Sequence, residues 1–292
     1  MANTRELRRR IRSVKNTSQI TKAMEMVAAT KMRRAQNQAL AGRPYVETLK
    51  ITLAKVLTSL DKLTHILFSK NDAQRAAVLV LSTDKSLCGS LNTSLFRVLL
   101  GLEEDIDVKV ENIDFYTLGR KGREFVAKTG RQLSGDFENH EVVNYSKAVF
   151  TRKFFQKLFM ETKVQSVYIL YPHFVSTLRQ EPRLIKILPV EHPRETAESI
   201  LTEFEMEEEF IFEPNKAQLL DYLLTHYLDT AVYQTLLETK ASEHSARMIA
   251  MKNATDNADE LTDDLTLTYN QVRQDAITSE LSEITTASLA LE

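Results

Sequence analysis

The residues best suited by type to phosphate chemistry form one short segment, Ser86-Leu-Cys-Gly-Ser-Leu-Asn92. It follows the apolar run Ala76–Ser82 and precedes a helix-forming stretch, which is the position of a nucleotide-binding turn in many α/β proteins. Such a turn needs several glycines so that backbone amides can close around the anion, and this segment has only Gly89. It matches neither G-x-x-x-x-G-K-[ST] nor G-x-G-x-x-G. We therefore expect a tight turn with a helix cap.

The other candidates for chemistry are weaker. Gly119-Arg-Lys-Gly122 has the spacing of the GXXG loop with which KH domains clamp RNA, but a glycine turn between a strand and a helix also explains it. The six histidines show no H-E-x-x-H pair and no Cys/His pair with zinc-binding spacing. Cys88, the single cysteine, has no obvious histidine or cation beside it and is expected to be a small buried side chain. We expect no catalytic site, no metal and no cofactor. The alternative to a non-catalytic chain is an α/β enzyme with helical extensions. It predicts that the isolated chain binds nucleotide or turns over a substrate.

Glycine and proline, which end helices, are confined to the middle of the chain. All seven glycines lie between Gly42 and Gly135, and all six prolines lie between Pro44 and Pro214. The first ~41 and last ~78 residues lack both, whereas an average helix has only ~11–12 residues. We predict three parts: an N-terminal helix over residues 1–60, a central domain over 70–213 and a C-terminal helix over 214–292.

The central part alternates apolar runs with helix-forming stretches, which predicts a mixed α/β fold with an open, largely parallel sheet. Strands are expected over Ala76–Ser82, Val108–Leu118 and Val164–Tyr171, with edge strands over Arg183–Val190 and Phe210–Phe212. Helices are expected over Asn92–Leu102, Lys121–Lys128 and Lys147–Glu161, and a polar connection separates the last two. The acidic stretch Glu195–Glu209 is expected to be a solvated loop or a short helix.

Both ends of the chain show the spacing of helices that pack along one another. The C-terminal seam is expected to contain Ala258, Leu261, Leu265, Thr268, Val272 and Ala276, continued on an adjacent stripe by Ile277, Leu281 and Ile284. A weaker N-terminal stripe contains Leu7, Ile11, Val14, Thr21, Met24 and Ala28. Met24, Met26 and Met32 have two interpretations, as core filler or as an exposed polarisable surface for a sliding contact, and the sequence does not separate them.

The two ends carry opposite charge. Residues 1–34 hold ten Lys/Arg against two acids, and residues 256–292 hold nine acids against Arg273 alone. Opposite charges beside a seam favour association of the two helices. The alternative is a basic arm for nucleic acid, which predicts salt-sensitive DNA affinity of the isolated chain. Because the neutralising partner lies in the same chain and the net charge is -2, we expect no nucleic acid.

No run approaches the ~20 apolar residues that span a bilayer. Residues Met1–Arg12 carry five arginines but lack the apolar stretch of a secretion signal. The pattern continues into the predicted helix, so we interpret it as mature protein. The expectation is a soluble cytoplasmic chain.

Three segments resemble the F-type ATP synthase γ-subunit family: residues 20–35 (ITKAMEMVAATKMRRA), 83–92 (TDKSLCGSLN) and 241–284. The resemblance covers nearly the whole chain. It implies a long antiparallel coiled coil of the two terminal helices and a Rossmann-like central domain. It also implies a non-catalytic rotor that enters the α3β3 hexamer of F1, sits with the ε subunit on the c-ring of Fo, and transmits rotation driven by proton flow to the catalytic β subunits. Contact with the membrane would be indirect, at the cytoplasmic face of the bacterial inner membrane.

Carried onto this sequence, the resemblance places partner contacts at Met24, Lys85, Arg273, Gln274, Thr278 and Glu280. Two positions depart from the family pattern. Ser86 replaces the first glycine of the short motif, so we expect the turn to avoid positive φ there. Residues 285–288 (TTAS) replace the usual Gly-Ala pair, and the single Cys88 excludes the dithiol switch of the chloroplast family members.

Overall fold

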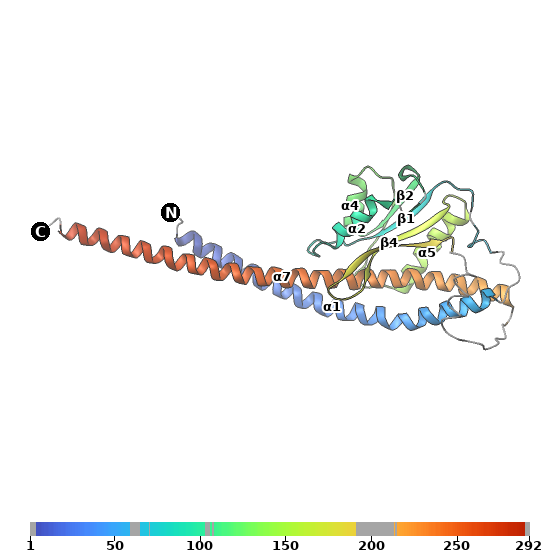
Figure 1. Ribbon diagram of the computed structural model, residues 1–292, viewed down its shortest axis with the longest axis horizontal. Helices are drawn as coiled ribbons and strands as arrows, with labels where there is room; N and C mark the ends of the chain where they lie inside the picture. The colour runs from blue at the N-terminus through green and yellow to red at the C-terminus, as the bar shows by residue number, and fades with distance from the viewer. Residues whose placement is uncertain are drawn as a thin grey trace. The chain divides into compact units, whose positions relative to one another are not determined.

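The computed structural model describes residues 4–58, 65–69, 71–102, 106, 108–190, 213 and 215–289 (Figure 1). The chain divides into two compact units. We call residues 1–29 with 247–292 the two-helix unit and residues 30–246 the α/β unit. Helix α1 (Thr4–Thr58) and helix α7 (Lys216–Leu289) each contribute residues to both units. The three parts predicted from the sequence are divided at the ends of the long helices. The two units of the structure are divided by compactness, so each long helix belongs to both.

The α/β unit contains a five-stranded sheet in the order β3-β2-β1-β4-β5. Its strands are β1 (Ala76–Leu81), β2 (Ile113–Leu118), β3 (Leu133–Phe137), β4 (Ser166–Phe174) and β5 (Gln180–Leu188). Strand β1 pairs in parallel with β2 and β4, β2 pairs in parallel with β3, and only β5 runs antiparallel to its neighbour β4. The mixed α/β class and the largely parallel sheet are confirmed. Every residue of β1 is buried, as expected for a central strand covered on both faces.

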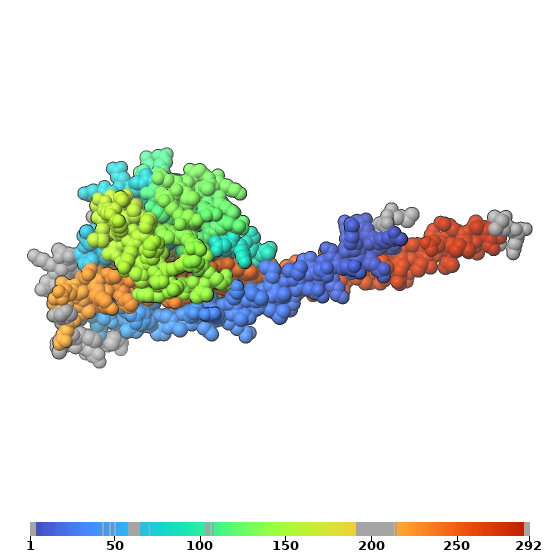
Figure 2. Space-filling model, turned by 180° about the vertical axis from the view of Figure 1, so that it is seen from behind, coloured from blue at the N-terminus to red at the C-terminus, as the bar shows by residue number. Residues whose placement is uncertain are grey.

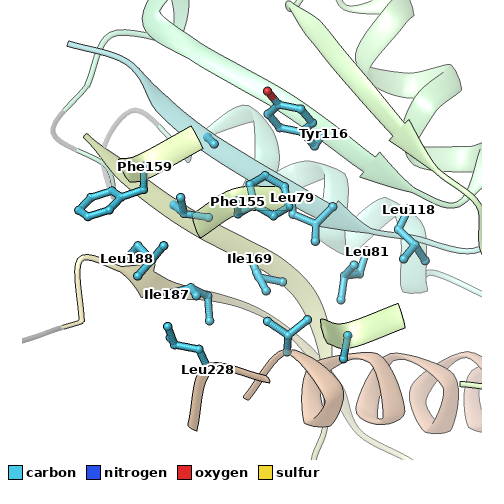
Figure 3. Close-up of a cluster of buried hydrophobic side chains, with 14 of the residues drawn as sticks. Leu79, Leu81, Tyr116, Leu118, Phe155, Phe159, Ile169, Ile187, Leu188 and Leu228 are labelled. Carbon is cyan, nitrogen blue, oxygen red and sulfur yellow. The ribbon is translucent and has the colours of Figure 1, made fainter. Parts of the chain in front are cut away.

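Helices cover the two faces of this sheet. They are α2 (Leu91–Leu100), α4 (Arg120–Lys128) and α5 (Tyr145–Met160), together with the α7 segment that contains Leu228 and Leu236. Alternate β1 residues point to opposite sides. Ala76, Val78 and Val80 pack against α2 and α4. Ala77, Leu79 and Leu81 pack against α5 and α7, in the cluster that Figure 3 shows.

Several element boundaries differ from the sequence prediction. The segment predicted as a polar connection contains β3, whose alternating half-buried and exposed residues give only a weak apolar signal at the sheet edge. The strand predicted from Val108 begins only at Ile113, after a 3-10 turn over Val110–Asn112. The edge strand predicted near Arg183–Val190 is confirmed as β5. The predictions for Glu195–Glu209 and Phe210–Phe212 lie outside the described residues.

Helix α1 continues through Gly42 and Pro44, although proline inside a helix costs about 3 kcal/mol. Burial beyond the proline offsets this cost, at about 1.5–3 kcal/mol for each fully buried aliphatic side chain. The cluster that supplies it contains Leu49, Leu53, Val56 and Leu57 of α1 with Leu220, Leu223 and Leu224 of α7. Gln234 of α7 also donates from Nε2 to the Ala39 carbonyl oxygen at 3.1 Å, on the N-terminal side of Pro44.

The two-helix unit is an antiparallel helix pair, as Figure 2 shows for α1 and the C-terminal half of α7. Ser18 Oγ donates to Asp259 Oδ1 at 2.6 Å, and the Thr21 and Thr255 hydroxyls lie 2.8 Å apart. On α1 the buried and half-buried positions include the predicted Leu7, Ile11, Val14, Thr21, Met24 and Ala28, with Ser18 added. The implied antiparallel arrangement is confirmed for these residues.

The predicted C-terminal seam is only partly right. Ala258 is buried and Leu265 and Val272 are half-buried, as expected. Leu261 and Thr268 are exposed, however, and the positions that face α1 are Thr262 and Tyr269. The predicted seam therefore has its steps of three and four in the wrong order after Ala258. A threonine and a tyrosine occupy the remaining heptad positions, and the Thr262 hydroxyl donates to the Ala258 carbonyl oxygen of its own helix at 2.8 Å. Ala276, at the end of the predicted seam, is also exposed.

Candidate partner interface

The C-terminal end of α7 has no part of α1 opposite it within the described residues. The contacts of Ser18 with Asp259 and of Thr21 with Thr255 fix the antiparallel register, which brings Thr4 level with Val272. Every described side chain from Arg273 to Ser288 is exposed. Figure 1 shows this red end of α7 extending past the blue start of α1. An end of this kind presents a complete helix surface to a partner.

Four of the predicted contact residues lie on this end. The Arg273 guanidinium carbon is 5.9 Å from the centre of the Tyr269 ring, a cation–π contact that restrains the side chain. Thr278 Oγ1 donates to the Gln274 carbonyl oxygen at 2.9 Å, so the hydroxyl is held against its own helix. Because α-helices repeat every 3.6 residues, Arg273 and Glu280 share one stripe, and Gln274 and Thr278 share another.

An apolar stripe runs along the same end. Ile277, Leu281 and Ile284 are 49%, 59% and 66% exposed, at heptad spacing. The sequence predicts this stripe as a continuation of the seam, but in the described residues no α1 side chain covers it. Exposed apolar surface beside polar groups is typical of a protein-binding face. The end of α7 is therefore one-sided, with apolar and polar faces.

The three methionines have different environments. Met32, in the α/β unit, is buried at 7% exposure, whereas Met26 in the two-helix unit is 58% exposed. Met24 is half-buried. Ile20 and Val27 are also more than half exposed on the same segment of α1. Met32 is therefore part of the packed core, and Met26 is exposed surface. The sequence analysis missed Ile20 and Val27, although their position off the heptad stripe is the signal that could have identified them.

Lys85 belongs to the turn after β1, in the α/β unit. Asn92 Nδ2 donates to Thr83 Oγ1 at 2.7 Å, and Thr83 Oγ1 donates to the Lys85 carbonyl oxygen at 2.8 Å. These bonds fix the backbone and leave the Lys85 and Leu87 side chains exposed. The expected tight turn is confirmed, and Cys88 is buried.

Two details of this turn were tested. Positive φ occurs at Leu87 (66°) and Gly89 (57°) but not at Ser86, which confirms that prediction. The predicted helix cap is right in position, because Ser90 is the N-cap residue of α2, but the Ser90 side chain makes no cap hydrogen bond. Asn92 reaches back to Thr83 and closes the turn in its place.

The glycine pair before and within α4 has a packing role. A Cβ atom at Gly119, whose φ is 108°, would lie 2.3 Å from the Ser82 carbonyl oxygen. A Cβ at Gly122 would lie 2.7 Å from Ser82 Oγ, which already accepts a hydrogen bond from the Gly122 amide at 2.7 Å. Gly122 is buried beside Ser82, so the expected glycine turn is confirmed, and its amide is not available to clamp RNA because it donates to Ser82.

Comparison with known proteins agrees with this architecture. A family model described as ATP synthase matches residues 3–291. The ATP synthase gamma chain of Opitutus terrae is 39% identical, covering 99% of both chains, and that of Methylacidiphilum infernorum is 41% identical over the full length of both. Among solved structures, a chain of the Euglena gracilis mitochondrial ATP synthase (OSCP/F1/c-ring) has a TM-score of 0.70 at 20% identity, covering 99% of this chain and 94% of that one.

An antiparallel helix pair with one exposed helix end, and a separate α/β unit with a five-stranded, largely parallel sheet, define the class of protein. The chain belongs to the ATP synthase gamma-chain family, the family of the central-stalk rotor subunit. The residues that resemble this family, 20–35, 83–92 and 241–284, all fall within the matched range.

Proposed function

We propose that this chain turns as a non-catalytic shaft inside the α3β3 hexamer of F1 and transmits rotation driven by proton flow to the catalytic β subunits. The observation that carries the proposal is the exposed, one-sided end of α7. A ligand shifts a conformational equilibrium only when it binds the two states with different free energy. A helix with an apolar face and a polar face presents a different surface to each of the three surrounding β subunits at any rotation angle. It therefore favours a different conformational state in each β subunit.

Arg273, Gln274, Thr278 and Glu280 supply the polar contacts of this end with the hexamer, and the apolar stripe supplies the rest. Met24 belongs to the same interface on the two-helix unit. Lys85, exposed on a turn that hydrogen bonds hold in place, supplies a second contact at the hexamer base. These six residues bind partners and take no part in chemistry.

The partners beyond the hexamer are the ε subunit and the c-ring of Fo. The solved structures to which the chain is similar support the c-ring as a partner, since one is described as OSCP/F1/c-ring and another as central stalk/c-ring. No helix in the described part of the chain has a stretch long and apolar enough to cross a bilayer. We propose that the chain associates indirectly, through the c-ring, with the cytoplasmic face of a bacterial inner membrane.

Reconstitution tests the proposal. Purified α and β subunits of the source organism would be mixed with the full chain, with a chain truncated after Val272, or with none, and ATPase and rotation measured. We expect the full chain to give a cooperative, rotating ATPase, and the truncated chain to join the hexamer with weaker coupling. Replacing Arg273, Gln274 and Thr278 together by alanine should lower coupling, while Asp263→Ala on the same helix should not.

Two results would overturn this function. One is a hexamer whose ATPase is unchanged by the chain. The other is salt-sensitive DNA binding by the isolated chain at physiological ionic strength, which would favour the basic-arm alternative.

A further inference from the structure

The α/β unit holds a cavity of about 410 Å³ that the rotor function does not use. It opens at the carboxyl ends of β2 and β3, where Leu118 and Phe137 end their strands. Val143, Phe150 and Leu236 complete its apolar walls. The volume falls within the ~300–1,000 Å³ of small-molecule sites, and the carboxyl edge of a parallel sheet is where α/β proteins commonly bind ligands.

The walls of this cavity are built from packed aromatic rings. The Phe137 ring makes an edge contact with Phe154 at 5.4 Å between ring centres and another with Phe150 at 6.5 Å. Phe150 is nevertheless 62% exposed, and Val142 at the same opening is 57% exposed. Large apolar side chains that stay exposed around the opening of an apolar cavity indicate that the apolar part of a ligand binds there.

One wall carries a buried cation. Lys240 of α7 lines the cavity and is only 9% exposed. Its closest carboxylate contact is Glu243 at 3.5 Å, which is long for a charge-assisted hydrogen bond. An ammonium group has three donors, and a buried ammonium is costly unless they are used. The Lys240 side chain therefore has donor capacity for an anionic group in the cavity.

Two other acids nearby, Glu141 and Glu138, have closer partners of their own. Glu141 accepts a hydrogen bond from Lys31 at 2.6 Å, and this bond, with weaker effects of His244 and Lys240, keeps the pKa of Glu141 below its usual range. Glu138 lines the cavity, but its carboxylate lies 3.5 Å from His140 and is largely exposed. The second lysine of the lining, Lys147, donates to the Glu138 carbonyl oxygen at 3.2 Å.

We propose that this cavity binds a small amphipathic carboxylate, with its apolar part against Phe137, Phe150 and Leu236 and its carboxylate on Lys240. The site is separate from the partner interface and does not depend on the rotor function. A neutral ligand of the same length would gain the apolar contacts but would offer no second carboxylate to the Lys240 ammonium, which already contacts Glu243. Discrimination between the two ligands is the signature of the site.

Titration calorimetry of the full chain with decanoate and with decan-1-ol tests this. We expect saturable one-to-one binding of decanoate, at least about tenfold tighter than decanol, because a charge-assisted hydrogen bond forms in a buried site. Lys240→Met, which keeps the apolar stem, should weaken decanoate about tenfold and decanol less than about twofold. Lys153→Gln, the same loss of charge at an exposed position on α5, should change neither.

A second pair of variants tests the cavity without touching the lysine. Val143→Trp should fill the cavity and abolish binding of both ligands, while Val175→Trp in the exposed turn after β4 should leave binding intact. Circular dichroism checks that each variant is folded. Equal affinity for decanoate and decanol, no saturable binding of decanoate, or unchanged binding in a folded Val143→Trp chain would each overturn the proposal.

Discussion

The strongest stability effect is expected at a buried ion pair between α5 and α7. Arg152 Nε donates to Asp229 Oδ1 at 2.7 Å, and Arg152 Nη2 donates to Asp229 Oδ2 at 3.1 Å. Both side chains are 8% exposed, and Arg152 also donates to Gln156. The test is Asp229→Ala, which removes the carboxylate and leaves the guanidinium buried with one neutral partner.

The magnitude follows from this geometry. Breaking a buried pair by removing one partner costs about 3–5 kcal/mol, mostly because the other charge is left without compensation. The surviving bond from Arg152 to Gln156 reduces that penalty, so we expect the lower half of the range, about 3–4 kcal/mol. Replacing both partners by apolar residues, as in Arg152→Met with Asp229→Leu, removes the charge itself. The free energy of unfolding of that double variant should fall much less, by about 1 kcal/mol or below.

Urea unfolding of the full chain, followed by circular dichroism and by hydrogen exchange of α5 amides, measures these differences. Hydrogen exchange is needed because a chain with two compact units need not unfold in one step. The control is Asp221→Ala on the same helix, where the carboxylate is 73% exposed and the loss should stay below about 1 kcal/mol. The reasoning is refuted if Asp229→Ala costs no more than this control, or if the double variant is as unstable as the single one.

Three further predictions concern other parts of the chain. Gly122→Ala should lower the free energy of unfolding by about 1–3 kcal/mol, because the new Cβ would clash with Ser82. Gly101→Ala should be neutral or stabilising, because its Cβ would meet nothing closer than 3.9 Å. The urea unfolding midpoints of the two variants measure the difference. Leu265→Ala should lower the melting temperature of the helix pair more than Leu261→Ala does, because Leu265 is half-buried and Leu261 is exposed. A loss at Leu261 as large as that at Leu265 would restore the seam predicted from sequence, which contains both residues. Burial raises the pKa of Asp114, but hydrogen bonds from Arg75 and Ser134 outweigh it and leave the pKa lowered. This carboxylate therefore stabilises the fold above the ordinary Asp pKa of about 3.9, and stability is lost as pH falls through its lowered value. Asp114→Asn should be less stable than the native chain at pH 7, with the difference shrinking in acid; a difference constant from pH 7 to about 2 would contradict this.

The amino-acid sequence by itself determined the main elements of this protein. The absence of glycine and proline at both ends predicts the two long helices, because no other residues break helices so strongly. The apolar runs at Ala76–Ser82 and Val164–Tyr171 predict β1 and β4, because strands buried on both faces need continuous apolar residues. The heptad stripe on α1 and the family resemblance likewise follow from the sequence alone.

Only the tertiary structure decided which side chains meet. Arg152 and Asp229 are 77 residues apart, and neither carries a local signal that it is buried or paired. The seam of α7 passes through Thr262 and Tyr269 because contacts with α1 fix the register of the helix pair. The spacing of residues along α7 does not by itself specify those contacts. The cavity beside Lys240 arises where the ends of two strands meet α5 and α7. Local patterns fix the elements because backbone propensity and periodicity are local, whereas contacts depend on how those elements pack.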